Sequence, residues 1–270
     1  MILVLVRRLA RVPGLARLTR IDTVTRISFA LRGSLVRERF RFALDELRAR
    51  SLGIYHLRGS DVAVAIRHRT PDVLVLDEIF SQREYDLPEP VLATLGTAPR
   101  VVDVGANIGL FGAFVLTRFP SASIVAIEAD PANAAVHERA IAANPGRDWR
   151  LVRGFAAAST REVHFAAGGF ATSHAAGEAS TVVEAIDVFP LLAGADLVKI
   201  DIEGAEWELL ADPRFAGLSA RALVLEYHAG GADPAADAEA ALRRAGFEVR
   251  RHARKPRFGA GVLWAWRPNA

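Results

Sequence analysis

The chain has 270 residues, of which 51% are hydrophobic, and a formal net charge of +3. This length and composition fit a large globular domain with a filled core, and they exclude a disordered or fibrous protein. The absence of cysteine excludes disulfides, thiolate zinc sites and a cysteine nucleophile. It also fits a reducing compartment, so we expect a cytoplasmic location.

The first fifty residues are predicted to be largely helical and are rich in arginine. Residues 1–6 are apolar and precede Arg7 and Arg8, which reverses the order found in a secretion signal. No stretch is long enough to span a membrane. Arginine and leucine are interleaved over residues 1–20. This pattern predicts either an amphipathic helix packed on the domain or peripheral attachment to a membrane or a partner protein.

From residue 54 the pattern changes to short runs rich in branched residues. Residues 55–58, 62–66 and 73–76 are separated by turn-forming segments, which predicts a small antiparallel sheet. We therefore assign residues 1–98 to an N-terminal helical and small β extension that acts as a substrate cap or an oligomerisation contact, which leaves a homodimer open.

After residue 98 apolar runs alternate with helical segments. The strands are expected at residues 101–104, 123–127, 149–153, 197–200 and 222–225, with hairpin strands and a loop over 159–189. A closing strand pair is expected at residues 247–249 and 262–266. This order predicts a doubly wound, Rossmann-like α/β domain over residues 99–270, with a mostly parallel sheet and a C-terminal antiparallel strand pair.

The turn after the first of these strands reads Asp-Val-Gly-Ala-Asn-Ile-Gly over residues 103–109. Ligands of open α/β sheets bind at such turns, and Gly105 and Gly109 allow a close approach of the backbone. Ala106 and Asn107 follow Gly105 directly, so the dinucleotide fingerprint G-x-G-x-x-G is absent. Asp103 offers a carboxylate that suits a cationic, amino-acid-like ligand.

Glu128 ends the second strand, where an acidic side chain can accept both hydroxyls of a ribose. A helix-capping role for Glu128 is the simpler alternative. Together with the turn at Asp103, Glu128 favours S-adenosylmethionine over a nicotinamide cofactor. Phe155 and Ala156 follow the third strand, where we expect the adenine, and Tyr85 is expected to close over the methionine end.

The chain resembles the FkbM-type methyltransferases over roughly residues 60–230. The resemblance rests on residues 103–109, on the corner at 128–131, and on Lys-Ile-Asp-Ile-Glu-Gly-Ala-Glu at 199–206. Ala129 departs from the family, which commonly has proline there. The resemblance implies S-adenosylmethionine as the methyl donor. The residues expected to bind it are Tyr85, Asp103, Gly105, Ala106, Asn107, Gly109, Glu128, Ala129, Phe155, Ala156 and Asp201.

Five candidate catalytic residues follow or end the fourth and fifth strands. Asp201 and Glu203 alternate with Lys199 along one segment, so their side chains can share one side of the sheet. Glu226 and His228 repeat this arrangement on the next strand. His228 is the best base by its ordinary pKa, and a carboxylate with a raised pKa is the alternative.

A divalent metal held by Asp201, Glu203 and Glu226 is chemically reasonable. Charge complementarity to a sulfonium explains the same carboxylates, so no metal site is predicted. The resemblance implies a hydroxyl of a sugar or natural product as acceptor. Two alternatives stay open: N-methylation of a peptide side chain, and a non-catalytic protein that binds S-adenosylmethionine. We expect no nucleic-acid substrate, because neither a base-flipping tetrapeptide nor a basic-aromatic groove is visible.

Overall fold

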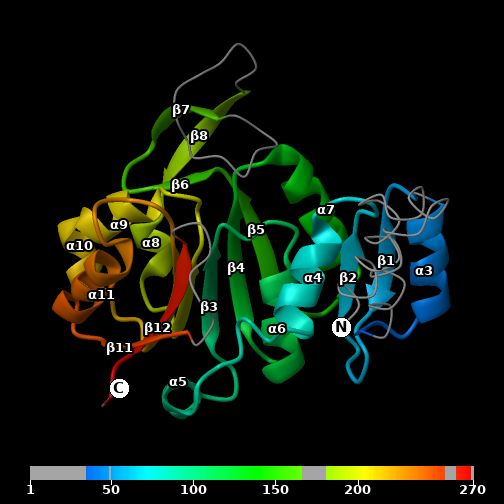
Figure 1. Cartoon of the computed structure of the whole chain (residues 1–270), viewed down its shortest axis with the longest axis horizontal. Coiled ribbons are helices and arrows are strands. Elements are labelled where there is room, and N and C mark those ends of the chain that lie inside the picture. Colours follow the sequence, from blue (N-terminus) through cyan, green and yellow to red (C-terminus); the bar gives the residue numbers. More distant parts are fainter. Residues whose placement is uncertain (1–34, 49, 166–180, 253–259, 269–270) are drawn as a thin grey trace, which may run out of the picture. The chain divides into compact units, whose positions relative to one another are not determined.

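The computed structural model describes residues 35–48, 50–165, 181–252 and 260–268 (Figure 1). The chain divides into two compact units, Met1–Glu84 and Tyr85–Ala270. The division therefore falls at residue 84, whereas the sequence placed the end of the extension at residue 98.

The first unit combines two helices with a two-stranded sheet. Its elements are α3 (Arg39–Leu47), β1 (Gly53–His56), β2 (Ala63–Ile66) and α4 (Asp72–Phe80). Strands β1 and β2 pair antiparallel, with Gly53 opposite Ile66, which confirms two of the three predicted strands. Helix α3 lies within the predicted helical segment, and the part of that prediction that covers residues 1–34 lies outside the described residues.

The third strand predicted in this unit is wrong, because residues 73–76 belong to α4. Pro71 precedes this helix, and Asp72 stands in its first turn, where a negative charge interacts favourably with the helix dipole. The buried side chains Val73, Leu76 and Ile79 recur every third residue, which is a helical spacing. A four-residue apolar run alone does not distinguish the two structures.

The second unit is built on a seven-stranded sheet with the order β11-β12-β10-β9-β3-β4-β5. Its strands are β3 (Arg100–Val104), β4 (Ser123–Glu128), β5 (Trp149–Arg153), β9 (Leu197–Ile200), β10 (Ala222–Tyr227), β11 (Glu248–Arg251) and β12 (Gly261–Trp266). Strands β3, β4, β5, β9 and β10 run parallel, and β12 pairs antiparallel with β10 and β11. The predicted doubly wound sheet and its closing antiparallel pair are confirmed.

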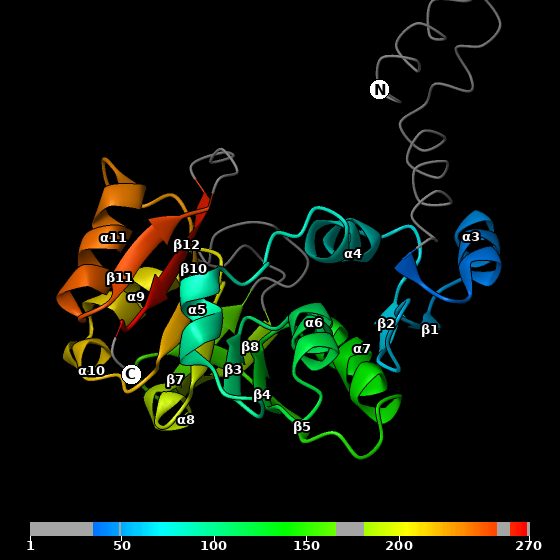
Figure 2. The ribbon, with the colours of Figure 1, turned by 90° about the horizontal axis from the view of Figure 1, so that it is seen from below.

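Helices cover both faces of this sheet. They are α5 (Glu89–Thr94), α6 (Leu110–Arg118), α7 (Pro131–Ala142), α8 (Phe189–Leu192), α9 (Glu206–Ala211), α10 (Pro213–Ala216) and α11 (Pro234–Arg244). Figure 2 shows α6 and α7 beside the β3–β5 end of the sheet and α11 beside β11. A smaller sheet has the order β6-β8-β7, with β6 (Phe155–Ala157), β7 (Arg161–Phe165) and β8 (Thr181–Asp187). Strand β6 and helices α8 and α10 are not among the predicted elements.

The buried charged side chains of the central strands lie on one face of the sheet. Val102 and Val104 of β3 and Val198 and Ile200 of β9 are buried in a cluster with side chains of α8 to α11. Because side chains alternate along a strand, the residues between them, Asp103 and Lys199, point to the opposite face.

Candidate active site

The turn between β3 and α6 requires glycine at residue 105. Gly105 has φ +80°, and a Cβ there would lie 1.7 Å from the carbonyl oxygen of Asp201. The amides of Gly105 and Ala106 both donate to the carbonyl of Ile127, at 3.0 and 2.9 Å. Gly109, with φ +88°, is the N-cap of α6. The turn is therefore fixed tightly against the carboxyl ends of β4 and β9.

Glu128 connects this turn to the start of α7. Its two carboxylate oxygens accept backbone N–H bonds from Asn107 and Asp130, each at 2.8 Å. Burial raises the pKa of Glu128, while these bonds oppose the rise. The side chain of Asn133 also bonds this carboxylate, whose two oxygens together have about four acceptor sites. The capping role is therefore present, and an additional bond from Glu128 to a ribose hydroxyl stays a prediction.

Asp103 and Lys199 form a buried ion pair behind the turn. They are directly opposite each other on the parallel strands β3 and β9, and Lys199 Nζ lies 3.1 Å from Asp103 Oδ1. The ammonium also donates to the carbonyl of Gly105 at 2.9 Å. Burial opposes the charge of Lys199, but Asp103 and Asp201 outweigh it and raise its pKa. The cation that Asp103 faces in this structure is thus the chain's own lysine, so direct contact between Asp103 and a cationic ligand stays a prediction.

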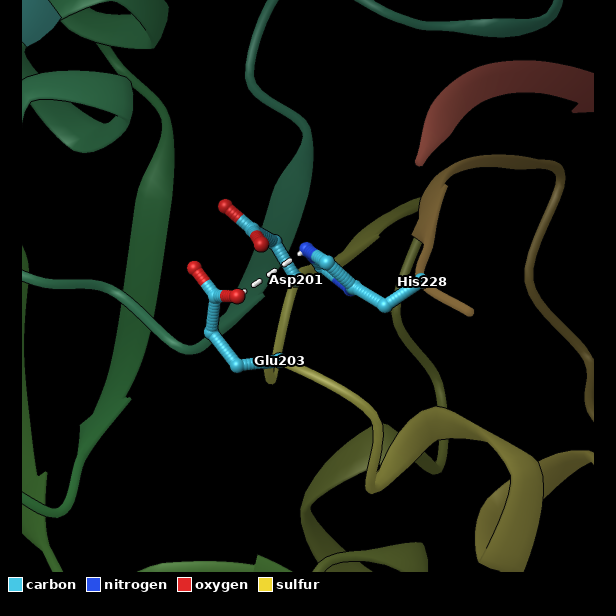
Figure 3. A group of neighbouring side chains, drawn as sticks. All are labelled: Asp201, Glu203 and His228. Carbon is cyan, nitrogen blue, oxygen red and sulfur yellow. Dashed lines mark ion pairs between the residues drawn. The ribbon is translucent and has the colours of Figure 1, made fainter. Parts of the chain in front are cut away.

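Asp201, Glu203 and His228 converge at the carboxyl ends of β9 and β10 (Figure 3). Each offers one ligand atom, and these atoms lie within 4.8 Å of one another. His228 Nε2 lies 3.2 Å from Glu203 Oε2. Glu203 has φ +52°, a left-handed conformation that costs a residue with a side chain about 1 kcal/mol and is concentrated at functional sites.

Glu206 holds His228 from the other side. Its Oε1 accepts the backbone N–H of His228 at 2.7 Å and lies 3.3 Å from Nδ1, and its Oε2 accepts the N–H of Gly204 at 2.7 Å. Burial opposes the charge of His228, but the bond to Glu206 and the charges of Asp201, Glu203 and Glu206 raise the pKa of His228 to about 9. At neutral pH His228 is therefore an imidazolium.

Tyr85 and Glu226 extend the cluster. The Tyr85 hydroxyl donates to Glu226 Oε2 at 3.2 Å, and its ring meets that of Phe111 edge-on with centroids 5.2 Å apart. Lys199 Nζ lies 5.9 Å from the centre of the Tyr85 ring. Tyr85, a sequence candidate far upstream in the chain, is thus brought to the same face as the candidate catalytic residues.

Three cofactor candidates lie away from this cluster. Ala156 is 5% exposed and packs in the core on the α8–α11 face, whereas Phe155 is half-buried. Ala129 is half-buried at the corner before α7. Their contacts with a cofactor stay predictions, and the burial of Ala156 leaves Phe155 as the better candidate for the adenine.

Two supporting residues had not been assigned roles from the sequence. Glu206 lies in the 199–206 motif, and from the sequence it fits either the site or an ordinary first helical turn. His137 is fully buried beneath the turn, and a Cβ on Gly109 would lie 2.6 Å from its ring. Burial lowers the pKa of His137 to about 4, so this ring is neutral and packs against the turn.

The side chains that could ligate a metal differ in one member from the set weighed in the sequence. His228 joins Asp201 and Glu203 in place of Glu226. In the protonated state both imidazole nitrogens of His228 are donors and have no lone pair for a metal. A metal ion would therefore have to displace the proton of His228. In its protonated form His228 already offsets part of the negative charge of the carboxylates.

A family model described as "Methyltransferase FkbM domain" matches residues 103–249, more than half of the chain. A curated relative, methyltransferase sdnD from Sordaria araneosa, is 39% identical over 70 residues; the match covers 26% of this chain and 25% of that protein.

A solved structure shows the same fold. The methyltransferase FkbM from Methylobacillus flagellatus KT aligns with a TM-score of 0.51 at 13% identity, over 91% of this chain and 60% of that one. Precorrin-6y C5,15-methyltransferase from Geobacter metallireducens GS-15 aligns with a TM-score of 0.43 at 18% identity, over 68% and 92%.

Proposed function

Because this chain belongs to the FkbM methyltransferase family and carries an S-adenosylmethionine-dependent methyltransferase domain, we propose that it methylates a hydroxyl group on a sugar or natural-product acceptor. The charge of the candidate site is the observation that best supports this proposal. Two cations face five carboxyl groups there: Lys199 and His228 against Asp103, Asp201, Glu203, Glu206 and Glu226. The excess of negative charge suits a ligand that carries a sulfonium and an ammonium.

The residues at the turn fit such a ligand. Gly105 has no side chain to obstruct the approach to β9, and the Glu128 carboxylate is held at the end of β4 by the backbone N–H groups of Asn107 and Asp130. We assign the ribose to Glu128, the adenine side to Phe155, and the cationic methionine end to Asp201. When bound, S-adenosylmethionine supplies a methyl group on a positively charged sulfur. The task of the chain is then to align an acceptor oxygen and to remove its proton.

We assign the proton-accepting role to Glu203. His228 is already protonated at neutral pH, so it cannot accept another proton. Burial, with the charges of Asp201 and Glu206, raises the pKa of Glu203 despite the neighbouring His228. A carboxylate with a raised pKa is a stronger base than an ordinary one. Glu206 then acts as a positioning residue, because it fixes the ring of His228, and His228 in turn orients Glu203.

N-methylation of a peptide side chain is the competing activity, and a non-catalytic binding protein is the competing class. Incubation with methyl-labelled S-adenosylmethionine and matched panels of polyhydroxylated acceptors and peptides separates all three. We expect label on acceptor oxygen, as an ether that resists alkali. Label found exclusively on peptide nitrogen would contradict the O-methylation assignment. Cofactor binding without transfer to any acceptor would favour the non-catalytic class.

A further inference from the structure

One face of α3 exposes large apolar side chains. In the described part of the chain five large hydrophobic residues are exposed, and three belong to this helix: Phe40 at 79%, Leu44 at 41% and Leu47 at 55%. Their spacing of four and three residues places them on one side of the helix. We call Phe40, Leu44 and Leu47 the α3 stripe.

The opposite side of α3 anchors the helix within its own unit. Phe42 is fully buried, with its ring 4.9 Å from that of Tyr55 and 5.1 Å from that of His68. Both acidic residues of α3 also point inward. Asp45 accepts the Tyr55 hydroxyl at 2.8 Å, and Glu46 lies 2.8 Å from His68 Nδ1.

The outward charges of this helix are therefore cationic. Arg39, Arg41 and Arg48 are exposed around the α3 stripe. Glu38, just before the helix, is half-buried, and its carboxylate lies 2.7 Å from His56 Nδ1. Helices that lie in the interface of an anionic lipid bilayer have this composition: an apolar stripe bordered by basic side chains, with the acidic side chains on the opposite side of the helix.

The sequence around this helix strengthens the charge argument. Twelve of the 34 Lys and Arg residues lie in the first fifty positions, together with four of the 31 acidic residues. The rest of the chain is net acidic, since the whole carries only +3. Residues 1–34 alone hold seven arginines and one acid, interleaved with apolar residues. A strong charge asymmetry of this kind indicates a polyanionic partner for the basic end.

We propose that the α3 stripe and its flanking arginines bind an anionic lipid surface. Nucleic acid shares the negative charge, and Phe40 offers a base one stacking surface, but Leu44 and Leu47 beside it offer neither stacking nor hydrogen bonds. A lipid interface accepts apolar side chains below its headgroups and arginine among them. The inference goes beyond methyl transfer: it places the first unit at a membrane where the acceptor, the product or a neighbouring enzyme is held.

Sedimentation of the full chain with vesicles tests this proposal without cofactor or acceptor. Vesicles of phosphatidylcholine alone are compared with vesicles that also contain phosphatidylserine. We expect binding to the anionic vesicles, weakened by salt because exposed charges are screened. Replacement of the α3 stripe by serine (F40S/L44S/L47S) should weaken binding at least about tenfold. The matched control is Leu74→Ser, which changes an apolar residue on α4 that is 45% exposed.

All three replaced side chains are exposed, so the variant should keep the thermal unfolding midpoint of the wild type. Absence of wild-type binding, equal binding to neutral vesicles, or unchanged binding of the triple variant would each overturn the proposal. A wild-type dimer that the triple variant dissociates, without vesicle binding, would show that a second copy covers the stripe. Loss of methyltransferase activity has no bearing on these outcomes, so the two proposals fail separately.

Discussion

The chemistry of single residues in this site depends on the charges around them. His228 is held between two carboxylates, with Glu203 at 3.2 Å and Glu206 at 3.3 Å. The same histidine would be a good base in isolation, because its ordinary pKa lies near neutrality. The neighbouring carboxylates raise its pKa to about 9, and for this reason the proposed function assigns the proton-accepting role to Glu203.

The base assignment predicts the effect of removing one carboxylate. Glu203→Gln should lower kcat about 10²- to 10⁴-fold while the KM for S-adenosylmethionine changes little, because the lost group acts on the acceptor proton. Glu208→Gln is the matched control. Glu208 is an exposed residue of α9, and its Oε2 lies 2.8 Å from Nη2 of Arg161 in β7. Steady-state kinetics measure both variants. A kcat of Glu203→Gln within about twofold of the wild type would contradict the assignment.

The raised pKa of His228 predicts a pH-dependent stability. Its value is about 9 in the folded chain against 6.5 ordinarily. The protonated form is therefore favoured by folding, so its contribution is fully present below pH 6.5 and is lost as the pH rises through 9. Urea unfolding between these pH values should show the wild type losing on the order of 2 kcal/mol relative to His228→Asn. Parallel stability profiles of the two proteins would show that folding leaves the pKa of His228 unchanged.

At the scale of elements, the β3–α6 turn fixes the backbone geometry around Asp201. Its glycine at 105 lets the turn lie against the backbone of Asp201, which brings the ends of β3, β4 and β9 together. The register of the sheet forms the ion pair behind this turn, because Asp103 and Lys199 lie directly opposite each other on β3 and β9.

A comparison of Gly105 with Gly146, which lies between α7 and β5, distinguishes backbone strain from steric collision. Gly105 and Gly146 both have φ +80°, but a Cβ on Gly146 would meet nothing within 4 Å. Gly146→Ala should cost about 1 kcal/mol of unfolding free energy from strain alone. Gly105→Ala should cost at least about 2 kcal/mol more, because the new methyl group collides with a backbone oxygen. Equal losses in urea unfolding would mean that β9 moves aside without cost.

The regular elements were predictable because strand and helix periods are local properties of the sequence. The predicted strands 149–153 and 197–200 agree with β5 and β9 to the residue. Residues 73–76 were misassigned because an apolar run of four fits either period. Strand β6 was not predicted because its three residues are too few to show a pattern.

The grouping of the candidate residues was predictable, but their pairing with neighbouring side chains was not. Asp201, Glu203 and His228 were expected to meet because neighbouring parallel strands end at one edge. That Lys199 would neutralise Asp103, or that Glu206 would reach His228, depends on register and on side-chain conformation. Such distances between residues far apart in the sequence decide which group is charged. They cannot be predicted from the hydrophobic periodicity of the sequence.

For the molecule as a whole, basic and acidic residues are concentrated in different parts of the chain. The first fifty residues carry the excess of arginine, and the second unit holds the carboxylates that suit a cationic cofactor. Among the described residues no helix has the length and apolar character to cross a bilayer. The central claim is that the second unit binds S-adenosylmethionine at the turn after β3.

Calorimetric titration of the full chain with S-adenosylmethionine tests this claim most directly. We predict one binding site per chain, with an affinity about tenfold lower in Glu128→Gln, because one charged hydrogen-bond acceptor is lost. Glu138→Gln, an exposed residue of α7 paired with Arg153, should bind as the wild type does. Equal affinity in all three proteins would contradict the role of Glu128 in binding the ribose. Absence of binding heat from the folded wild-type chain at millimolar S-adenosylmethionine would contradict the central claim itself.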